Sequence, residues 1–268
     1  MTEDRSQRRD VLGVAFDAVS FEEALKRAIE FAQDASKTNV IVAVNPEKVM
    51  AARRSAELAN FIRNSALAVP DGIGIVAAAK LLYRLNIERV PGADLALAFC
   101  KAASANNLKI FLFGAQEEVN RRAAAKLKEI DPNIQIVGRQ NGYINEEQYD
   151  SLVERINESR ANAVLIALGS PKQERWIAEY GSRLNAGLCM GVGGAFDALV
   201  GKVKRAPLAW QNAGLEWFYR LLRQPSRFRR QRRIFQFAFL VVCLTVKERY
   251  FTRVSRRDSR DGSHLKES

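Results

Sequence analysis

The sequence predicts an α/β fold in which a mostly parallel β-sheet is flanked by helices. Short apolar runs rich in β-branched residues alternate with segments of helical periodicity, and Gly or Pro bounds most of these runs. Strands of a parallel sheet are buried on both faces, so they read as continuous apolar runs. With 268 residues, 47% of them hydrophobic, the chain is long enough to bury one substantial core.

Six apolar runs are the candidate strands. In chain order they are NVIVAVN (39–45), LAVPDGIGIV (67–76), KIFLFGA (109–115), IQIVG (134–138), AVLIALGSPKQE (163–174) and GLCMGVGGAF (187–196). Helical patterns such as EKVMAARRSAELANFIRNS and EEVNRRAAAKLKEI separate them. Strands that alternate with helices in this way form βαβ units around one sheet.

Polar residues and glycines gather where these runs end. In open parallel sheets, ligands bind outside the carboxyl ends of the strands. The segments at those ends are Asn45-Pro46-Glu47, Pro70-Asp71-Gly72, Gly114-Ala115, Gly169 to Glu174, and Gly191 to Asp197. Their recurrence predicts an active-site rim, and it makes Gly114, Glu174 and Gly193 candidate substrate-binding residues.

Asp71 follows an apolar run directly and precedes a helix. A carboxylate there can act as a general base that deprotonates a hydroxyl group attacking an electrophilic carbon. The alternative is that Asp71 caps the helix that begins near Ile73. The residues alone leave both interpretations open. For Asp197, the favoured interpretation is a carboxylate in a turn. For Glu216, it is an ion pair with a nearby Arg.

The segment GSPKQE (169–174) combines a glycine, a lysine, an amide and the start of a helix. Helix N-termini bind phosphate through free N–H groups and the helix dipole, so a ligand role is favoured. The alternative is an ordinary turn with Pro171 at the first helical position.

Several kinds of site find little support. The single histidine, His264, lies in the polar C-terminal tail, and no CxxC, HExxH or Asp-x-Asp pattern indicates a metal. Cys100, Cys189 and Cys243 have no paired spacing, which indicates reduced thiols in the cytosol. We expect neither a metal nor another cofactor.

The positive charge is concentrated at the C-terminal end. Residues 1–201 contain 25 Lys and Arg and 25 Asp and Glu, whereas residues 202–268 contain 17 and 5, which is the whole net charge of +12. A neutral body with a cationic end indicates that a polyanion is held at one place. Nucleic acid, an anionic membrane and a diphosphate remain candidates, as does a solvated tail.

Together these motifs resemble the WecG/TagA/CpsF family of bacterial glycosyltransferases. The matching stretches are VNPEKV (44–49), PDGIG (70–74), RVPGADL (89–95), FLFGA (111–115), NGY (141–143), GSPKQE (169–174), MGVGGAFD (190–197) and GKVKRAP…GLEWFYRLLRQPSR (201–227). The last of these look most like the WecG branch, which serves enterobacterial common antigen, whereas TagA-type members serve wall teichoic acid. The resemblance implies a Rossmann-like α/β body with a helical cationic appendage at its C-terminus.

The resemblance also implies a reaction: inverting, metal-independent transfer of N-acetylmannosamine or its uronic acid from a UDP-sugar. The acceptor would be undecaprenyl-diphosphate-linked N-acetylglucosamine at the cytoplasmic face of the membrane. Asp71 matches the family's general base. Arg89 is the second catalytic candidate. Together with Asn45 and Gln173, it matches the polar residues that the family places around the sugar and phosphates. The appendage arginines are matched by Arg220, Arg227 and Arg230. Ala43 stands where the family commonly has Thr, so the donor preference is open.

The sequence therefore predicts three regions: an α/β body over 1–200, an appendage over 201–250, and a disordered polar tail over 251–268. Within the appendage, IFQFAFLVVCLTV (234–246) is too short to span a bilayer and is expected to lie at the membrane interface. Packing against the body or a partner subunit is the alternative. We expect a cytoplasmic protein, peripheral on the inner face of the membrane, and leave a homo-oligomer open.

Two other functions remain. One is transfer of glucose or another sugar from UDP in exopolysaccharide assembly. The other is nucleic-acid binding through the basic end, which explains the charge but not the strand-end motifs. Because no aromatic and basic platform for single strands occurs, nucleic acid is not expected as a partner.

Overall fold

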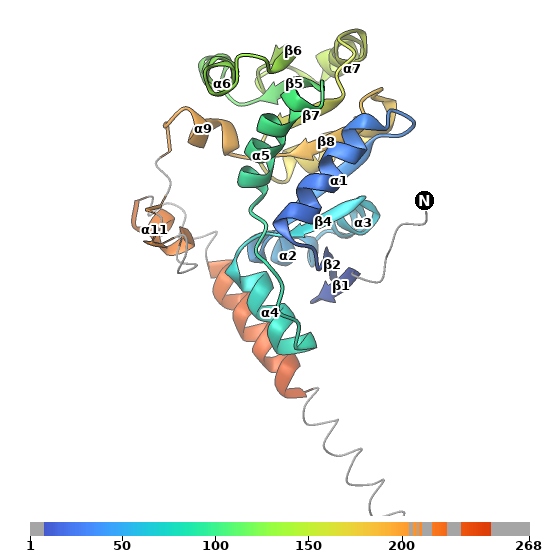
Figure 1. Ribbon diagram of the computed structural model, residues 1–268. Coiled ribbons are helices and arrows are strands. Elements are labelled where there is room, and N and C mark those ends of the chain that lie inside the picture. Colours follow the sequence, from blue (N-terminus) through green and yellow to red (C-terminus); the bar gives the residue numbers. More distant parts are fainter. Residues whose placement is uncertain (1–7, 204–205, 208, 211–215, 224–231, 248–268) are drawn as a thin grey trace, which may run out of the picture.

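The computed structural model describes residues 8–203, 206–207, 209–210, 216–223 and 232–247, with Arg220 and Arg223 described by their backbone alone. A six-stranded sheet with the order β4-β3-β8-β7-β5-β6 lies at the centre (Figure 1). All of its strand pairs are parallel, as the sequence predicted. The strands are β3 (Asn39–Val44), β4 (Leu67–Pro70), β5 (Lys109–Gly114), β6 (Gln135–Gln140), β7 (Ala163–Ala167) and β8 (Leu188–Gly191).

Helices cover both faces of the sheet, because successive side chains of each strand point to opposite sides. In β7, Ala163, Leu165 and Ala167 join one hydrophobic cluster, whereas Val164 and Ile166 join another. The first face packs against α1 (Phe21–Gln33), α5 (Gly92–Ala105), α6 (Glu117–Ile130) and α9 (Ala195–Leu199). The clusters on the other face include α2 (Pro46–Ala52), α3 (Ala56–Asn64), α4 (Ile73–Tyr83), α7 (Tyr149–Glu158) and α8 (Lys172–Tyr180).

Three other helical elements of the described residues are short. Two 3₁₀ turns, η2 (Glu146–Gln148) and η3 (Gly181–Arg183), precede α7 and follow α8. Helix α11 (Glu216–Arg223) lies apart from the layers of the body, on the side of α9 (Figure 1).

The starts of the helices differ in a way that matters for the site. Helices α1, α2 and α3 each begin with a polar side chain that accepts a backbone hydrogen bond: Ser20 from Glu23, Asn45 from Lys48, and Ser55 from Leu58. Helices α4 and α8 have no such side-chain cap. Pro171 is the N-cap residue of α8 and not its first helical residue, one position earlier than the sequence suggested.

An N-terminal hairpin was not anticipated from the sequence. Strands β1 (Arg8–Val11) and β2 (Val14–Asp17) pair antiparallel, and four-residue strands leave little periodicity to detect. The buried carboxylate of Asp17 holds the hairpin on the body. It pairs with Arg8 at 2.7 Å and accepts a hydrogen bond from the backbone N–H of Ala68 in β4, also at 2.7 Å.

A helix over residues 232–247 contains the apolar segment that the sequence assigned to the membrane interface. It lies beside α4 (Figure 1), where Phe237 and Val241 are buried in the same hydrophobic cluster as Ile75 and Ala78. The alternative of packing on the body is therefore correct for this face. The side chains that remain exposed are Phe235, Phe239, Val242 and Val246.

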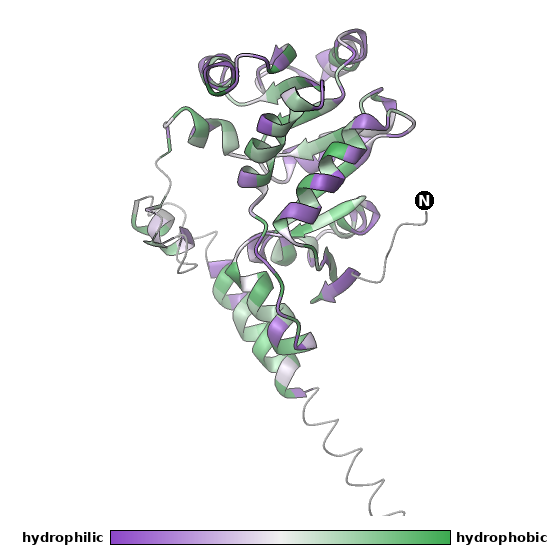
Figure 2. Cartoon of the chain, in the orientation of Figure 1, coloured by the Kyte–Doolittle hydropathy of each residue, from purple (hydrophilic) through white to green (hydrophobic). Residues whose placement is uncertain are grey.

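Much of this helix and of α4 is hydrophobic along its length (Figure 2). Even so, none of the helices in the described ranges has the length and hydropathy needed to cross a bilayer.

Candidate active site

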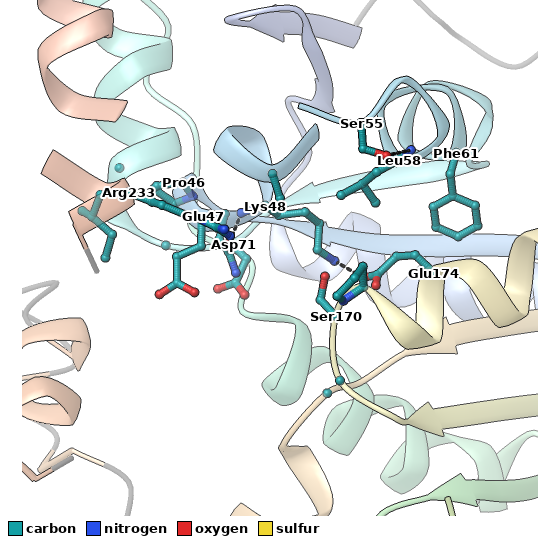
Figure 3. A pocket seen from close by; sticks show the side chains of 18 of the residues that line it. Pro46, Glu47, Lys48, Ser55, Leu58, Phe61, Asp71, Ser170, Glu174 and Arg233 are labelled. Carbon is teal, nitrogen blue, oxygen red and sulfur yellow. Dashed lines mark hydrogen bonds and ion pairs between the residues drawn. The ribbon is translucent and has the colours of Figure 1, made fainter. Parts of the chain in front are cut away.

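A cavity of about 710 Å³ opens at the carboxyl ends of β3, β4, β7 and β8 (Figure 3). This volume lies in the range of pockets that hold small-molecule ligands. Five of the residues selected from the sequence line it: Asn45, Asp71, Arg89, Glu174 and Gly193. The structure thus brings together residues from segments that are up to 148 positions apart in the chain.

Asp71 lies where β4 gives way to α4, half-buried at the cavity wall. Its backbone N–H donates to the carbonyl of Val44 at 2.8 Å, which fixes it beside the end of β3. The N-cap of α4 is Gly72, whose φ of 91° favours glycine. Asp71 is therefore not the N-cap residue of α4, and it is one of the residues that line the cavity.

Arg89 lies next to Asp71 because the N–H of Val90 donates to the carbonyl of Pro70 at 2.8 Å. Its guanidinium forms an ion pair with Glu216 Oε2 at 3.7 Å, and both side chains are mostly buried. The predicted pairing of Glu216 with an arginine is confirmed. This contact joins the cavity wall to α11.

Asn45 follows β3 and caps α2, where its Oδ1 accepts the backbone N–H of Lys48 at 2.9 Å. The same helix turn presents the Lys48 side chain, which forms an ion pair with Glu174 of α8 at 2.7 Å. Both side chains of this pair are less than a tenth exposed, at 7% and 4%. Figure 3 shows the pair crossing the cavity between Asp71 and the apolar side chains of Leu58 and Phe61.

The carboxyl of Glu174 is held in its charged form. Burial alone would raise its pKa, but the ammonium of Lys48 and nearby hydrogen-bonding groups outweigh burial and lower the pKa below its ordinary value. Gln173, the preceding residue, is also buried and is not among the residues that line the cavity. Its amide makes two contacts inside the protein: Nε2 donates to Glu174 Oε1 at 3.2 Å, and Oε1 accepts from the N–H of Gly193 at 3.1 Å.

Gly114 lies at the end of β5, outside the cavity lining. An added Cβ there would come within 2.5 Å of the Ala167 backbone, so close packing of β5 on β7 requires this glycine. Asn120 of α6 holds the same strand end, donating to the carbonyls of Gly114 and Gln140. The structure assigns packing to Gly114 and does not bring it to the cavity.

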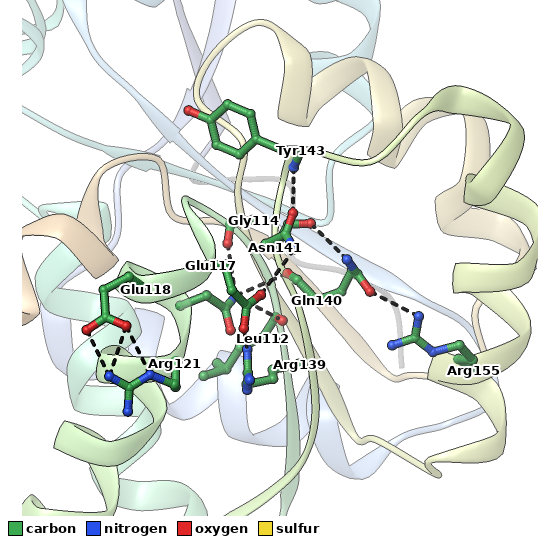
Figure 4. A network of polar contacts seen from close by, with 11 residues as sticks. Leu112, Gly114, Glu117, Glu118, Arg121, Arg139, Gln140, Asn141, Tyr143 and Arg155 are labelled. Carbon is green, nitrogen blue, oxygen red and sulfur yellow. Dashed lines mark hydrogen bonds and ion pairs between the residues drawn. The ribbon is translucent and has the colours of Figure 1, made fainter.

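Polar side chains surround the end of β5 (Figure 4). Glu117 pairs with Arg139 and accepts a hydrogen bond from Asn141 at 3.1 Å, and the hydrogen bonds from Arg139 and then Asn141 lower its pKa. Tyr143, in the matching NGY motif, is 76% exposed.

Of the three appendage arginines, one lies in a described helix and two do not. Arg220 lies in α11, while Arg227 and Arg230 lie outside the described residues, as do His264 and the predicted tail over 251–268. A different arginine lines the cavity: Arg233, at the start of the helix over 232–247.

The sequence did not single out Arg233, because a run of arginines ahead of an apolar segment carries no sign of which ones face the cavity. It also missed Lys48 as part of the site, although the VNPEKV motif contained it.

The cavity offers a half-buried carboxylate, mostly buried cations and two helix N-termini without a side-chain cap, which suits a sugar with anionic phosphates. The cavity residues described here include equal numbers of acidic and basic side chains, five of each. No cluster of three or more potential metal ligands occurs within the described ranges. A family model for the glycosyl transferase WecG/TagA/CpsF family matches residues 9–251. The chain therefore belongs to the WecG/TagA/CpsF family of glycosyltransferases.

Proposed function

We propose that this glycosyltransferase moves N-acetylmannosamine or N-acetylmannosaminuronic acid from a UDP-sugar to undecaprenyl-diphosphate-linked N-acetylglucosamine, with inversion and without a metal. The observation that carries the proposal is the position of Asp71, whose carboxylate lies at the cavity, is not the helix cap, and has Arg89 beside it. Family membership and the motifs shared with the WecG branch support the substrates.

In this reaction Asp71 takes the proton of an acceptor hydroxyl as its oxygen forms a bond to the anomeric carbon of the donor sugar. The bond between that carbon and the phosphate oxygen breaks on the opposite side, and UDP leaves with the electron pair. Arg89 and the appendage arginines, Arg220, Arg227 and Arg230, stabilise the negative charge on the phosphates. Fixed cations are most effective where charge develops in a site shielded from water.

We propose that the enzyme acts at the inner face of the cell membrane, where its lipid-linked acceptor lies. The exposed apolar side chains of the helix over 232–247 support this, because single-residue exposure is ordinary but Phe235, Phe239, Val242 and Val246 share one helix. Basic residues flank this helix on both sides, and they favour anionic lipids.

A second donor has one observation in its favour. Ala43, where the family commonly has Thr, packs so closely that a Cβ added to Gly92 would come within 2.6 Å of its own Cβ. The hydroxyl group that the family commonly has is absent at this position, so the donor preference stays open to another UDP-sugar, such as UDP-glucose.

The test is turnover of the purified full chain with a panel of UDP-sugars and a short-chain prenyl-diphosphate-linked N-acetylglucosamine. We expect UDP-N-acetylmannosamine or its uronic acid to give the highest kcat/KM and an inverted product. Preference for UDP-glucose would support the second donor instead. A melting temperature raised by an oligonucleotide and not by UDP would contradict both and favour nucleic-acid binding.

A further inference from the structure

The buried ion pair between Lys48 and Glu174 spans the centre of the sheet edge. Lys48 follows β3 and Glu174 follows β7, and β8 lies between these two strands. The two side chains therefore meet across the carboxyl end of β8, at 2.7 Å.

Gln173 connects this pair to β8 itself. Its Nε2 donates to the Glu174 oxygen that binds Lys48, and its Oε1 accepts from the N–H of Gly193. The amide lies directly on Gly191, where an added Cβ would be 2.5 Å from Nε2. The charged carboxylate accepts only, so it sets which end of the amide faces it and leaves the oxygen for Gly193.

The other end of the bridge reaches the proposed base. The backbone N–H of Lys48 donates to Asn45 Oδ1, which fixes the first turn of α2 on the end of β3. Val44 directly precedes Asn45, and its carbonyl accepts the N–H of Asp71. A chain of contacts thus runs from Asp71 on one wall of the cavity to Gly193 on the opposite wall.

We propose that Lys48 and Glu174 are positioning residues, which set the distance between these two walls and hold the Gln173 amide in one orientation. This rests on the proposed glycosyl transfer, with Asp71 as base. Glu174 and Gln173 then act through the backbone at Gly193 and not by touching the sugar. Buried ion pairs often add little stability compared with apolar side chains of the same volume, which favours a role in geometry.

The test uses a double variant, Lys48→Met with Glu174→Leu, which replaces both charges by apolar groups of similar size. We expect it to fold, and kcat to fall roughly 10- to 100-fold while KM for the donor stays unchanged, because misplacing catalytic groups by about 1 Å has this effect. Glu174→Gln keeps an acceptor oxygen for Gln173, so it should retain more turnover than the double variant.

Arg8→Met is the matched control, because it breaks another largely buried ion pair, with Asp17, away from the cavity. It should lower the melting temperature and leave kcat unchanged. If the double variant is also less stable, both are assayed at a temperature where each is folded. Equal kcat for the two variants there overturns the proposal.

A spectroscopic measurement separates this proposal from the proposed function. The side-chain amide of Gln173, assigned in a ¹⁵N–¹H spectrum by its loss in Gln173→Glu, should move toward the position of a free amide in the double variant. An unchanged signal overturns the positioning role whatever the activity. A signal that moves, in a wild-type protein that transfers no sugar, supports the bridge and rejects the proposed reaction.

Discussion

Asp71 is the residue on which the proposed chemistry depends most directly. Asp71→Asn keeps the shape of the side chain but removes the base, so turnover should fall by roughly two to four orders of magnitude, the usual contribution of general-base catalysis. The melting temperature should stay near that of the wild type, since Gly72 and not Asp71 caps α4. Steady-state kinetics and thermal unfolding measure both quantities.

Asp150→Asn serves as the control, because Asp150 is exposed and pairs with Arg183 away from the cavity. Turnover of Asp71→Asn close to that of Asp150→Asn would remove Asp71 from the mechanism.

Glu174 should make stability depend on pH in the acidic range. Its pKa is lower in the folded protein than in the unfolded chain, where a glutamate has a pKa of about 4.3. The stabilisation it provides is therefore complete above that value and is lost as the pH falls through the lowered folded pKa. Urea unfolding from pH 7 down to about pH 3 should show a steeper loss of unfolding free energy for the wild type than for Glu174→Gln. Parallel curves would contradict the lowered pKa.

At this scale the sequence located five of its ten candidate residues at the cavity. Asn45, Asp71 and Glu174 line it because each comes after a strand, and parallel strands all end at the same edge. Arg89 comes after a helix and reaches the cavity because the next residue, Val90, is hydrogen-bonded to Pro70. The sequence did not predict Lys48 as a site residue, and the reason is physical. Lys48 reaches the site through a long side chain that passes over β8, and a local sequence pattern does not indicate which strand lies between two others.

Among the elements, the helix over 232–247 combines two environments that its sequence could not separate. Its residues are apolar nearly all round, so periodicity does not distinguish a face that packs on protein from one that meets lipid. The structure makes the distinction: Phe237 is 2% exposed against α4, and Phe239 is 68% exposed.

These two phenylalanines provide a matched pair for testing the membrane proposal. Phe239→Ser should leave the melting temperature unchanged and reduce co-sedimentation with anionic liposomes, because the exposed ring contributes only to lipid contact. Phe237→Ala should lower the free energy of unfolding by about 3–5 kcal/mol, the usual cost of emptying a buried phenylalanine site. Liposome binding that Phe239→Ser does not alter would show that this face is not the membrane contact.

For the molecule as a whole, the proposed chemistry assigns the phosphate charge to arginines and to no metal. Turnover should therefore survive EDTA, with kcat and KM for the donor unchanged. The control is a magnesium-dependent glycosyltransferase assayed in the same buffer. Activity that EDTA abolishes and magnesium or manganese restores would contradict the proposal.

The class of the fold could be predicted from the sequence, but the order of the strands in the sheet could not. Continuous apolar runs such as 109–115 and 163–167 indicated a parallel sheet, because both faces of such a sheet are covered. The strand order could not be read in the same way. Each run pairs as readily with one apolar neighbour as with another, so the central place of β8, the last strand of this sheet in chain order, emerges only when the helices pack.

That central place has a consequence for how the protein is made. A ribosome delivers β3 and β4 first, then β5, β6 and β7, so the nascent chain holds two half-sheets whose inner edges are both open and apolar. Such edges associate readily with other chains. Only when residues 188–191 emerge does one strand of four residues join the halves. Closing the sheet is thus a late event in synthesis, and the cavity is completed later still, by Glu216, Trp217 and Arg233. We expect a chain that stops before Leu188 to be inactive and prone to aggregate.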